Sequence, residues 1–599
     1  MYPTIPQVKH FDLTNGSTVF KLNDHPKVTL RSERDDPRLE RHCRRAYPGM
    51  DFRREIGGTG YALHISSKDS LVVELTDEEL TALAGHKEGY LLTVQGSETS
   101  IRAMDAAGLF YGMQTLLQLM DQNADLPDLT IIDYPDTACR CMNYDLRQTH
   151  STPEKLVSYL ADFARYKVNA VLIEYEDKFP FAAYPEFVHP KHALSEEQFK
   201  ELQRMAHEYF IEIIPLQQCF GHLEYVLRLD GYKHLRETEK STGEICPSRP
   251  ETYALITTLL GEMMDRHPNS RYIHLGCDEV YSLCECMICQ ERYDGVRERA
   301  FISFLNRLIA FAVSRGKTPI FWHDMLHKCP EEELKHLDSR GVAMIWLYNG
   351  RNIEAETTEL FEKFSRIGLK VMGAPAVRSF DGAEHQNYPV IVNRVDNLLQ
   401  WTKAAEKLGI DCMVATNWTG PFSLGVPYGI FETTWYLMLL HADLSWNRWS
   451  DTGGYMDRFL SVFHGISPEV AHGKIGSYRI EDYYEIIWRL LDEVHKNKEY
   501  AELIGVMRGF EEATDRTPAI HKYAYRWEMY PGDAAERRSL LNQYQRNRRG
   551  REKVRPRMMT TLERYQPVDM AEHYVKSRFY LHDYLERTLY HEMGMTMDD

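Results

Sequence analysis

The sequence predicts an α/β fold: a (β/α)8 TIM-type barrel with a small N-terminal α+β domain before it and a C-terminal helical region after it. Short apolar segments with strand character alternate with helical segments between about residues 131 and 450. This alternation is typical of parallel βαβ units. Eight strand–helix units over this part of the chain fit the usual length of a barrel, about 200 to over 400 residues. The strand candidates begin near Cys141, Ala170, Ile211, Tyr272, Pro319, Ala343, Lys370 and Cys412.

Signals for helix starts support this register. Thr152 stands directly before a proline at a first helical position, and Ser195 with Gln198 and Ser248 with Glu251 have capping-box spacing. A doubly wound open sheet is the main competing fold. No glycine-rich phosphate-binding sequence follows any strand candidate to support it.

The chain divides into three expected units, 1–130, 131–450 and 451–599. Short apolar segments at 61–65, 71–75 and 90–94 predict strands in the first unit, and an amphipathic pattern predicts a helix over about 100–120. In the last unit, helical patterns cover 478–512, 534–545 and 568–593.

Composition excludes some classes of partner. The 599 residues carry a formal net charge of −17, which argues against nucleic acid or an anionic membrane as the main partner. The sequence has no apolar run of about 18 residues and no visible secretory signal, so we expect a cytoplasmic protein. Eleven scattered cysteines fit reduced thiols.

Two adjacent acids end the fourth strand candidate. Residues 272–275 have strand propensity, Gly276 breaks the pattern, and Asp278 and Glu279 follow at once. In a parallel barrel, catalytic groups gather at the carboxyl ends of strands, and a glycine-assisted turn lets both acids face one pocket. Taken alone, the dipeptide would fit a helix N-terminus equally well.

Polar and aromatic side chains recur at the other predicted strand ends. Acids, an arginine and tryptophans at one mouth indicate a sugar site. They are Asp145, Arg147, Glu174, Asp177, His222, Trp322, His323, Asp324, Trp346, Tyr348, Asn417 and Trp418.

The segment 274–279, HLGCDE, resembles the H-x-G-G-D-E signature of glycoside hydrolase family 20, the β-N-acetylhexosaminidases. Segments 173–180 (IEYEDKFP), 219–224 (CFGHLE) and 274–281 carry the resemblance most specifically, and it covers about residues 60–440. The resemblance is strongest to the intracellular, hexosaminidase D-like branch.

The resemblance implies an enzyme that supplies no nucleophile of its own. In that family the substrate's 2-acetamido oxygen attacks the anomeric carbon, an exception to the usual pair of catalytic carboxylates. Glu279 would then be the general acid and base, Asp278 would hold the acetamide nitrogen, and Tyr348 would donate to the acetamide oxygen. The implied substrate is a small glycan or glycoside with terminal GlcNAc or GalNAc, and the implied chemistry needs no cofactor.

The resemblance also implies supporting residues. Arg147 would bind ring hydroxyls, although it stands two residues after Asp145 where many relatives have three. The pocket walls would be Trp322, Trp346 and Trp418. The residues that would orient the acid pair are Asp177, His222 and His274.

Two departures from the family pattern stand out. Cys277 occupies the position of the second glycine, where the backbone needs to turn tightly. After Trp418 the chain reads TGPF, without the acidic residue that lysosomal relatives use to grip outer hydroxyls, so the preference between gluco and galacto sugars is open.

A cysteine cluster follows the acid pair. Cys284, Cys286 and Cys289, with Cys246 and Cys277 nearby, could hold a structural zinc with one further ligand, or they are simply reduced thiols. A catalytic zinc is the weakest interpretation, because such sites usually have histidine and carboxylate ligands.

Two points stay open at this stage. A non-catalytic carbohydrate-binding protein on the same fold is the alternative to an enzyme, and the presence of both acids and Tyr348 counts against it. The C-terminal helices permit packing on the barrel, a homodimer interface, or a residue lent to the pocket of a partner subunit.

Overall fold

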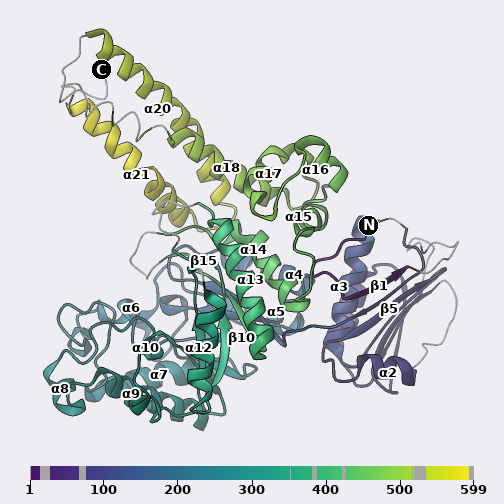
Figure 1. The fold of residues 1–599 in the computed structure, drawn as a ribbon, viewed down its shortest axis with the longest axis horizontal. Helices are drawn as coiled ribbons and strands as arrows, with labels where there is room; N and C mark the ends of the chain where they lie inside the picture. Colours follow the sequence, from purple (N-terminus) through teal and green to yellow (C-terminus); the bar gives the residue numbers. More distant parts are fainter. Residues whose placement is uncertain are drawn as a thin grey trace.

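The computed structural model describes residues 2–13, 20, 27–66, 76–123, 125–350, 352–380, 387–420, 427–515, 517, 522 and 534–592. Along the chain, these residues form an N-terminal sheet, a closed parallel barrel and a C-terminal set of helices (Figure 1). The predicted fold class is therefore confirmed.

The N-terminal sheet has the strand order β1-β7-β5-β6-β4-β2-β3, and every neighbouring pair except β2 and β3 is antiparallel. Helix α3 packs on β5 and β6. The strands are β1 (His10–Leu13), β2 (Lys27–Ser32), β3 (Asp51–Ile56), β4 (Tyr61–Ser66), β5 (Tyr90–Gln95), β6 (Glu98–Ala103) and β7 (Leu129–Asp133), and the helices are α1 (Pro37–Ala46), α2 (Asp77–Leu83) and α3 (Ala106–Gln122).

The predicted helix over 100–120 begins too early. Residues 98–103 form β6, whose alternating burial fits its place between β4 and β5. The helix begins only after Asp105, whose side chain caps it by accepting from the Gly108 amide. The strand candidate at 71–75 lies outside the described residues.

Eight parallel strands close the barrel, because β16 pairs with both β14 and β8. All eight predicted strands are present. They are β8 (Cys139–Asp145), β9 (Ala170–Glu174), β10 (Glu212–Leu216), β11 (Tyr272–His274), β12 (Thr318–Trp322), β13 (Val342–Trp346), β14 (Lys370–Ala374) and β16 (Cys412–Asn417), and a short β15 (Ala376–Arg378) pairs alongside β16.

Helices follow the barrel strands along the chain. The long ones are α4 (Pro153–Arg165), α5 (Glu196–Glu208), α7 (Pro250–Arg266), α9 (Arg297–Ser314), α12 (Ile353–Ser365), α13 (Ile391–Leu408) and α14 (Trp435–Trp446); the short ones are α6 (Glu224–Leu227), α8 (Met287–Tyr293), α10 (Asp324–His327) and α11 (Glu331–Leu334). Thr152 caps α4, and Ser195 with Gln198 forms the predicted capping box. The pair Ser248 and Glu251 does not, because α7 starts at Pro250 with Arg249 at the N-cap.

Buried ion pairs join the N-terminal sheet to the barrel. The Lys167 ammonium lies 2.8 Å from Asp133, and the Arg140 guanidinium lies 2.6 Å from Glu88. Both cations are almost fully buried and also face the Trp446 ring. Because a buried charge that loses its partner costs about 3–5 kcal/mol, these contacts hold the two units in one orientation. The three-unit division remains a proposal; β7 spans its first boundary.

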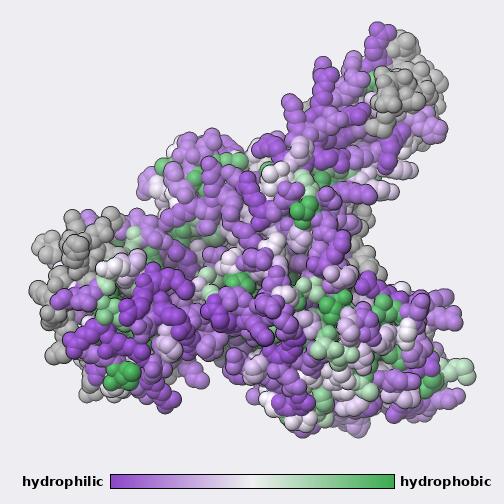
Figure 2. Space-filling model, turned by 180° about the vertical axis from the view of Figure 1, so that it is seen from behind, coloured by the Kyte–Doolittle hydropathy of each residue, from purple (hydrophilic) through white to green (hydrophobic). Residues whose placement is uncertain are grey.

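The C-terminal region is helical throughout its described part. The helices are α15 (Tyr455–Phe459), α16 (Pro468–Ile475), α17 (Tyr483–Arg489), α18 (Lys498–Thr514), α20 (Ala534–Leu562) and α21 (Val568–Glu592). The predicted helix over 478–512 is wrong as one element, because the chain turns between α17 and α18 through Asn497 at φ +51°. Helices α20 and α21 form an arm that projects from the barrel, with a largely hydrophilic surface (Figures 1 and 2). Among the described residues, no helix is long and apolar enough to cross a membrane.

Candidate active site

The acid pair sits on a tight turn beyond β11. Gly276, Cys277 and Glu279 have φ values of +64°, +70° and +51°, a left-handed conformation that costs an ordinary residue about 1–2 kcal/mol. A Cβ on Gly276 would lie 1.9 Å from the Gln218 side-chain oxygen, so any side chain at that position would displace Gln218. Cys277 adopts the conformation that the family's second glycine would suit. The turn is a strained segment of the kind that clusters at functional sites.

His222 joins the two acids. Its Nε2 lies 3.3 Å from Asp278 Oδ2 and 3.4 Å from Glu279 Oε2. The loop carrying His222 can approach because Gly221 has no side chain: a Cβ there would lie 2.4 Å from the Asp278 carbonyl oxygen. Both acids therefore lie at one imidazole nitrogen.

The charges of this group follow from their mutual contact. Burial alone lowers the pKa of His222, but the Asp278 and Glu279 carboxylates outweigh it and hold that pKa well above its usual value. Burial likewise raises the pKa of Asp278, and the neighbouring His222 and Arg147 cations reverse this and lower it. Asp278 is thus an ionised carboxylate beside an imidazolium.

Asp324 is a further member of the site. Its Oδ2 accepts from the Glu279 amide at 2.9 Å, and its Oδ1 accepts from Trp346 Nε1 at 3.2 Å. Burial, then the Asp278 charge, raises the pKa of Asp324 to about 7. Asp324 therefore links Trp346 to the backbone of the acid pair.

Glu174 lies at the end of β9, close to the same cluster. It accepts from Gln218 Nε2 at 2.9 Å and lies 3.7 Å from Arg147 Nε. Burial raises its pKa to about 7 against the opposing effect of Arg147. Glu174 and Asp324 were both visible as acids at strand ends, but sequence alone could not rank them, because their partners come from distant segments.

Aromatic side chains from three strand ends meet in one group. Trp418 Nε1 donates to the Tyr348 hydroxyl at 2.9 Å, and the Trp322 and Trp418 rings meet edge to face at 6.0 Å. The His274 ring lies 4.3 Å from Trp322, and the Arg147 guanidinium lies 4.9 Å from the Trp418 ring. The structure therefore brings these five predicted residues together.

Arg147 is fixed from below by Asp145. The Asp145 carboxylate accepts from Arg147 Nε at 2.9 Å and from the amide and hydroxyl of Thr419. Since the guanidinium is held on one edge by Asp145, its position over Trp418 is set before any ligand binds.

Several buried polar atoms of residues around the site have no hydrogen-bond partner among the described residues. A buried polar group left unpaired costs about 1–3 kcal/mol, so this group of atoms indicates a polar ligand. They include His274 Nε2, Trp322 Nε1, Asp278 Oδ1, Gln218 Oε1 and Glu174 Oε2.

Asp177 is not in contact with the acid pair. Its carboxylate accepts from Lys178 Nζ at 2.5 Å and faces Arg228 at 3.9 Å, and no hydrogen bond joins it to Asp278 or Glu279 in the described chain. Asp177 and Arg147 instead line a cleft of about 400 Å³ together with the start of α21. Glu279, Asp324 and Trp346 line a second cleft of about 520 Å³.

Comparison with known sequences identifies the family. The profile described as "Glycosyl hydrolase family 20, catalytic domain" matches residues 158–407, and "Glycosyl hydrolase family 20, domain 2" matches residues 1–134. Hexosaminidase D of Bos taurus is 30% identical over an alignment of 331 residues that covers 51% of this chain and 94% of that protein. The chain belongs to glycosyl hydrolase family 20. This family 20 glycoside hydrolase is also 30% identical to Hexosaminidase D of Homo sapiens, over 47% of its own length and 60% of the human protein.

Solved structures agree on the fold of this family 20 protein. A β-N-acetylhexosaminidase from Bacteroides fragilis superposes with a TM-score of 0.57 at 18% identity, covering 74% of this chain and 90% of that one. An exo-β-N-acetylglucosaminidase from Vibrio harveyi, solved in complex with N-acetylglucosamine, gives a TM-score of 0.58 at 16% identity over 77% of each chain. A chitobiase from Flavobacterium johnsoniae gives 0.59 at 15% identity over 99% of this chain and 94% of that one.

The turn before the acid pair can be tested with one substitution. Gly276→Ala should lower the melting temperature and the activity, because the new methyl group meets Gln218 in addition to the left-handed strain. Gly316→Ala is the matched control, since Gly316 has φ +75° with nothing within 4 Å of a Cβ. Thermal unfolding should show Gly276→Ala to be the less stable variant by roughly 1–3 kcal/mol. Equal losses in the two variants would contradict the close contact with Gln218.

The raised pKa of Asp324 predicts a pH dependence of stability. A carboxyl whose pKa is about 7 in the folded protein and near 4 when unfolded stabilises the fold fully only below the unfolded pKa, and this contribution is lost as the pH rises to 7. Between pH 4.5 and 7.5, Asp324→Asn should therefore lose less stability than the wild type. Chemical unfolding at both pH values measures this, and parallel losses would show that Asp324 is already ionised at pH 4.5.

Proposed function

We propose that this chain is an exo-acting β-N-acetylhexosaminidase that releases terminal β-linked GlcNAc or GalNAc from small glycans or glycosides with retention of configuration. The acetamido oxygen of the substrate serves as the nucleophile. The observation that carries this proposal is the position of both acids at one nitrogen of His222. Two-carboxylate glycosidases place their acids on either side of the scissile bond, whereas adjacent residues held on one imidazole occupy one side.

The environments of the two acids support different roles. The Glu279 side chain is 39% exposed and lines the larger cleft, where a leaving group can depart. Asp278 is 15% exposed and ionised, and its Oδ1 has no partner among the described residues. Glu279 accordingly protonates the leaving oxygen, and Asp278 accepts the acetamide N–H and stabilises the positive charge that develops on it.

The reaction then runs in two steps. The acetamido oxygen bonds to the anomeric carbon as the bond to the leaving oxygen breaks, and Glu279 gives its proton to that oxygen. The product of this first step is a cyclic oxazolinium intermediate. Water next attacks its anomeric carbon, Glu279 takes a proton from the water, and the bond between the anomeric carbon and the acetamido oxygen breaks. Both displacements invert the anomeric carbon, so the configuration is retained overall.

The remaining side chains position the sugar. The Tyr348 hydroxyl accepts the Trp418 N–H, which leaves its own proton to be directed to the acetamide oxygen. The rings of Trp322, Trp346 and Trp418 offer apolar surface to the acetamide methyl and the sugar face. Arg147 bonds ring hydroxyls from its place over Trp418. The presence of both acids together with Tyr348 favours an enzyme over a sugar-binding protein without turnover.

The roles of the two acids predict different responses to the leaving group. Glu279→Gln should lower kcat/KM by about 10²–10⁴ for glycosides with poor leaving groups, and far less for 2,4-dinitrophenyl glycosides, whose leaving oxygen needs no proton. Asp278→Asn should lower the rate similarly across the series. The series is measured with aryl N-acetyl-β-glucosaminides and galactosaminides, which also reports the sugar preference.

The control for these variants is Glu285→Gln, which removes an exposed carboxylate six residues further along the chain. It should retain wild-type rates. A loss in Glu279→Gln that is the same for every leaving group would exclude Glu279 as the general acid.

The proposed role of Tyr348 predicts a slower chemical step when its hydroxyl is removed. Tyr348→Phe should lower kcat by about 10²–10³, the cost of removing one preorganised donor to a developing charge. The change also leaves Trp418 Nε1 without its acceptor, so the melting temperature should fall slightly. Tyr272→Phe, at the opposite end of the barrel on β11, is the matched control. Unchanged kcat in Tyr348→Phe would remove Tyr348 from the mechanism.

A further inference from the structure

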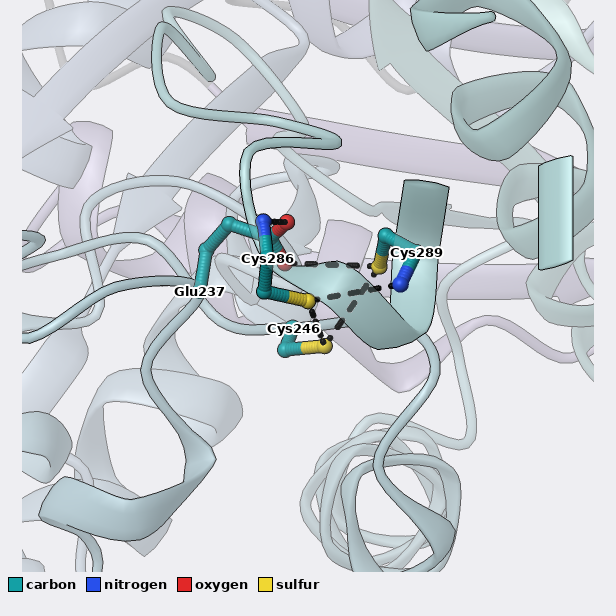
Figure 3. Close-up of side chains that lie close together, drawn as sticks. All are labelled: Glu237, Cys246, Cys286 and Cys289. Atoms are coloured by element: carbon teal, nitrogen blue, oxygen red, sulfur yellow. Dashed lines mark hydrogen bonds between the residues drawn. The ribbon is translucent and has the colours of Figure 1, made fainter. Parts of the chain in front are cut away.

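The thiols of Cys246, Cys286 and Cys289 and the carboxylate of Glu237 lie close together (Figure 3). Cys246 Sγ lies 3.6 Å from Cys286 Sγ and 3.5 Å from Cys289 Sγ, and Cys289 Sγ lies 3.5 Å from Glu237 Oε2. One ligand atom from each of the four residues lies within 4.8 Å of all the others. None of these residues takes part in the proposed catalytic chemistry.

These spacings match the edges of a tetrahedral zinc site. Zn–S bonds of about 2.3 Å and Zn–O bonds of about 2.0–2.2 Å place neighbouring sulfur atoms about 3.8 Å apart and sulfur and oxygen about 3.6 Å apart. A disulfide would need sulfur atoms about 2.05 Å apart. The three distances of 3.5–3.6 Å therefore fit coordination of a shared ion.

The charge of the cluster also calls for a cation. Glu237 is 2% exposed, and in the described part of the chain no ion pair with a lysine, arginine or histidine is formed by its carboxylate. Its only polar contacts in that part of the chain are the Cys286 amide at 3.0 Å and the Cys289 thiol. A buried carboxylate without a cation is costly, and a dication among soft sulfur ligands removes that cost.

Backbone and hydroxyl contacts prepare the sulfur atoms. Cys286 is the N-cap of α8, and its Sγ accepts from the Cys289 amide at 3.4 Å. The Ser248 hydroxyl lies 3.1 Å from Cys289 Sγ. Such outer contacts orient metal ligands and stabilise thiolates. The Cys-x-x-Cys spacing of 286 and 289 at a helix start supplies two of the four ligands from one turn.

We propose that Glu237, Cys246, Cys286 and Cys289 bind a structural zinc ion that clamps two active-site loops together. Glu237 and Cys246 belong to the loop after β10, which carries His222. Cys286 ends the loop after β11, which carries the acid pair, and Cys289 lies in the first turn of α8, directly after that loop. With four protein ligands, the ion has no open position for substrate. On binding, the three thiols release their protons to solvent.

The ligand set corrects the sequence interpretation at one position. Cys284, which sequence spacing grouped with Cys286 and Cys289, is not part of the cluster. Cys284 adopts φ +66° in the turn before α8. Its closeness in sequence to Cys286 therefore does not place its thiol in the cluster. Cys246 and Glu237 complete the set from a distant segment.

A second contact joins the same loops. The Glu244 carboxylate accepts from the amides of Tyr281 and Ser282 at 2.7 and 3.0 Å. Glu244 lies two residues before Cys246, and Tyr281 lies two residues after Glu279. The clamp is therefore continuous with the backbone that positions the acids.

The test begins with the metal content of the full-length wild-type protein purified without chelator, measured by mass spectrometry of the elements. We expect about one zinc per chain. Cys246→Ser, Cys289→Ser and Glu237→Gln should each lower the zinc content at least tenfold, while Cys284→Ser, the matched control, should retain it. Removal of zinc from the wild type should lower the melting temperature, and added ZnCl₂ should restore it.

Cobalt provides a readout that does not depend on the stability of the variants. Wild-type protein stripped of zinc and loaded with Co²⁺ should show the thiolate-to-cobalt charge-transfer band and the intense visible bands of a tetrahedral site. Cys284→Ser should show the same bands, and Cys286→Ser should lose them. The proposal would be overturned if folded wild-type protein contained no zinc and showed no cobalt bands. It would also be overturned if the protein mass were two hydrogens lower than that of the fully reduced chain because Cys246 forms a disulfide.

Discussion

The active site depends on how closely two loops approach each other at Gly221. The carbonyl of Asp278 occupies the space where any larger residue at 221 would place its Cβ, and this approach brings the His222 imidazole between the two acids. From that contact follow an imidazolium at His222 and an ionised Asp278. Burial, then the charge of Asp278, raises the pKa of the neighbouring Asp324 to about 7. The cysteine cluster and Glu244 contact the same two loops.

The barrel supplies a rigid base for these loops. Its interior is filled by apolar side chains from nearly every strand, so the pocket has a closed floor. Trp322 and Trp418 extend this apolar packing to the mouth of the barrel. Around them lie buried polar atoms that have no hydrogen-bond partner among the described residues. The N-terminal sheet is held to the outside of the barrel by buried Lys167 and Arg140, and α21 reaches the rim near Asp177.

Sequence predicted what depends on local pattern. Most barrel strands are short apolar runs, so the fold was predictable from local pattern. Asp278, Glu279, Tyr348 and the tryptophans stand at or just after such runs, which is why the sequence could propose them as residues of the mouth. The predicted helix over 100–120 began too early, because residues 98–103 pair with two neighbouring strands and form β6 instead. The partners of Asp324 and Glu174, and the joining of Glu237 and Cys246 to Cys286, depend on contacts between distant segments. No local spacing encodes these contacts.

Participation of the acetamido oxygen is the central claim, and one rate series tests it directly. The substrates are 4-nitrophenyl β-glucosaminides whose N-acetyl group carries none, one, two or three fluorine atoms. Fluorine withdraws electron density from the acetamido oxygen, so the account predicts that kcat/KM falls steeply with each added fluorine. Rates that hardly change along the series, or equal turnover of the glucoside that lacks the acetamido group, would mean that the protein supplies its own nucleophile.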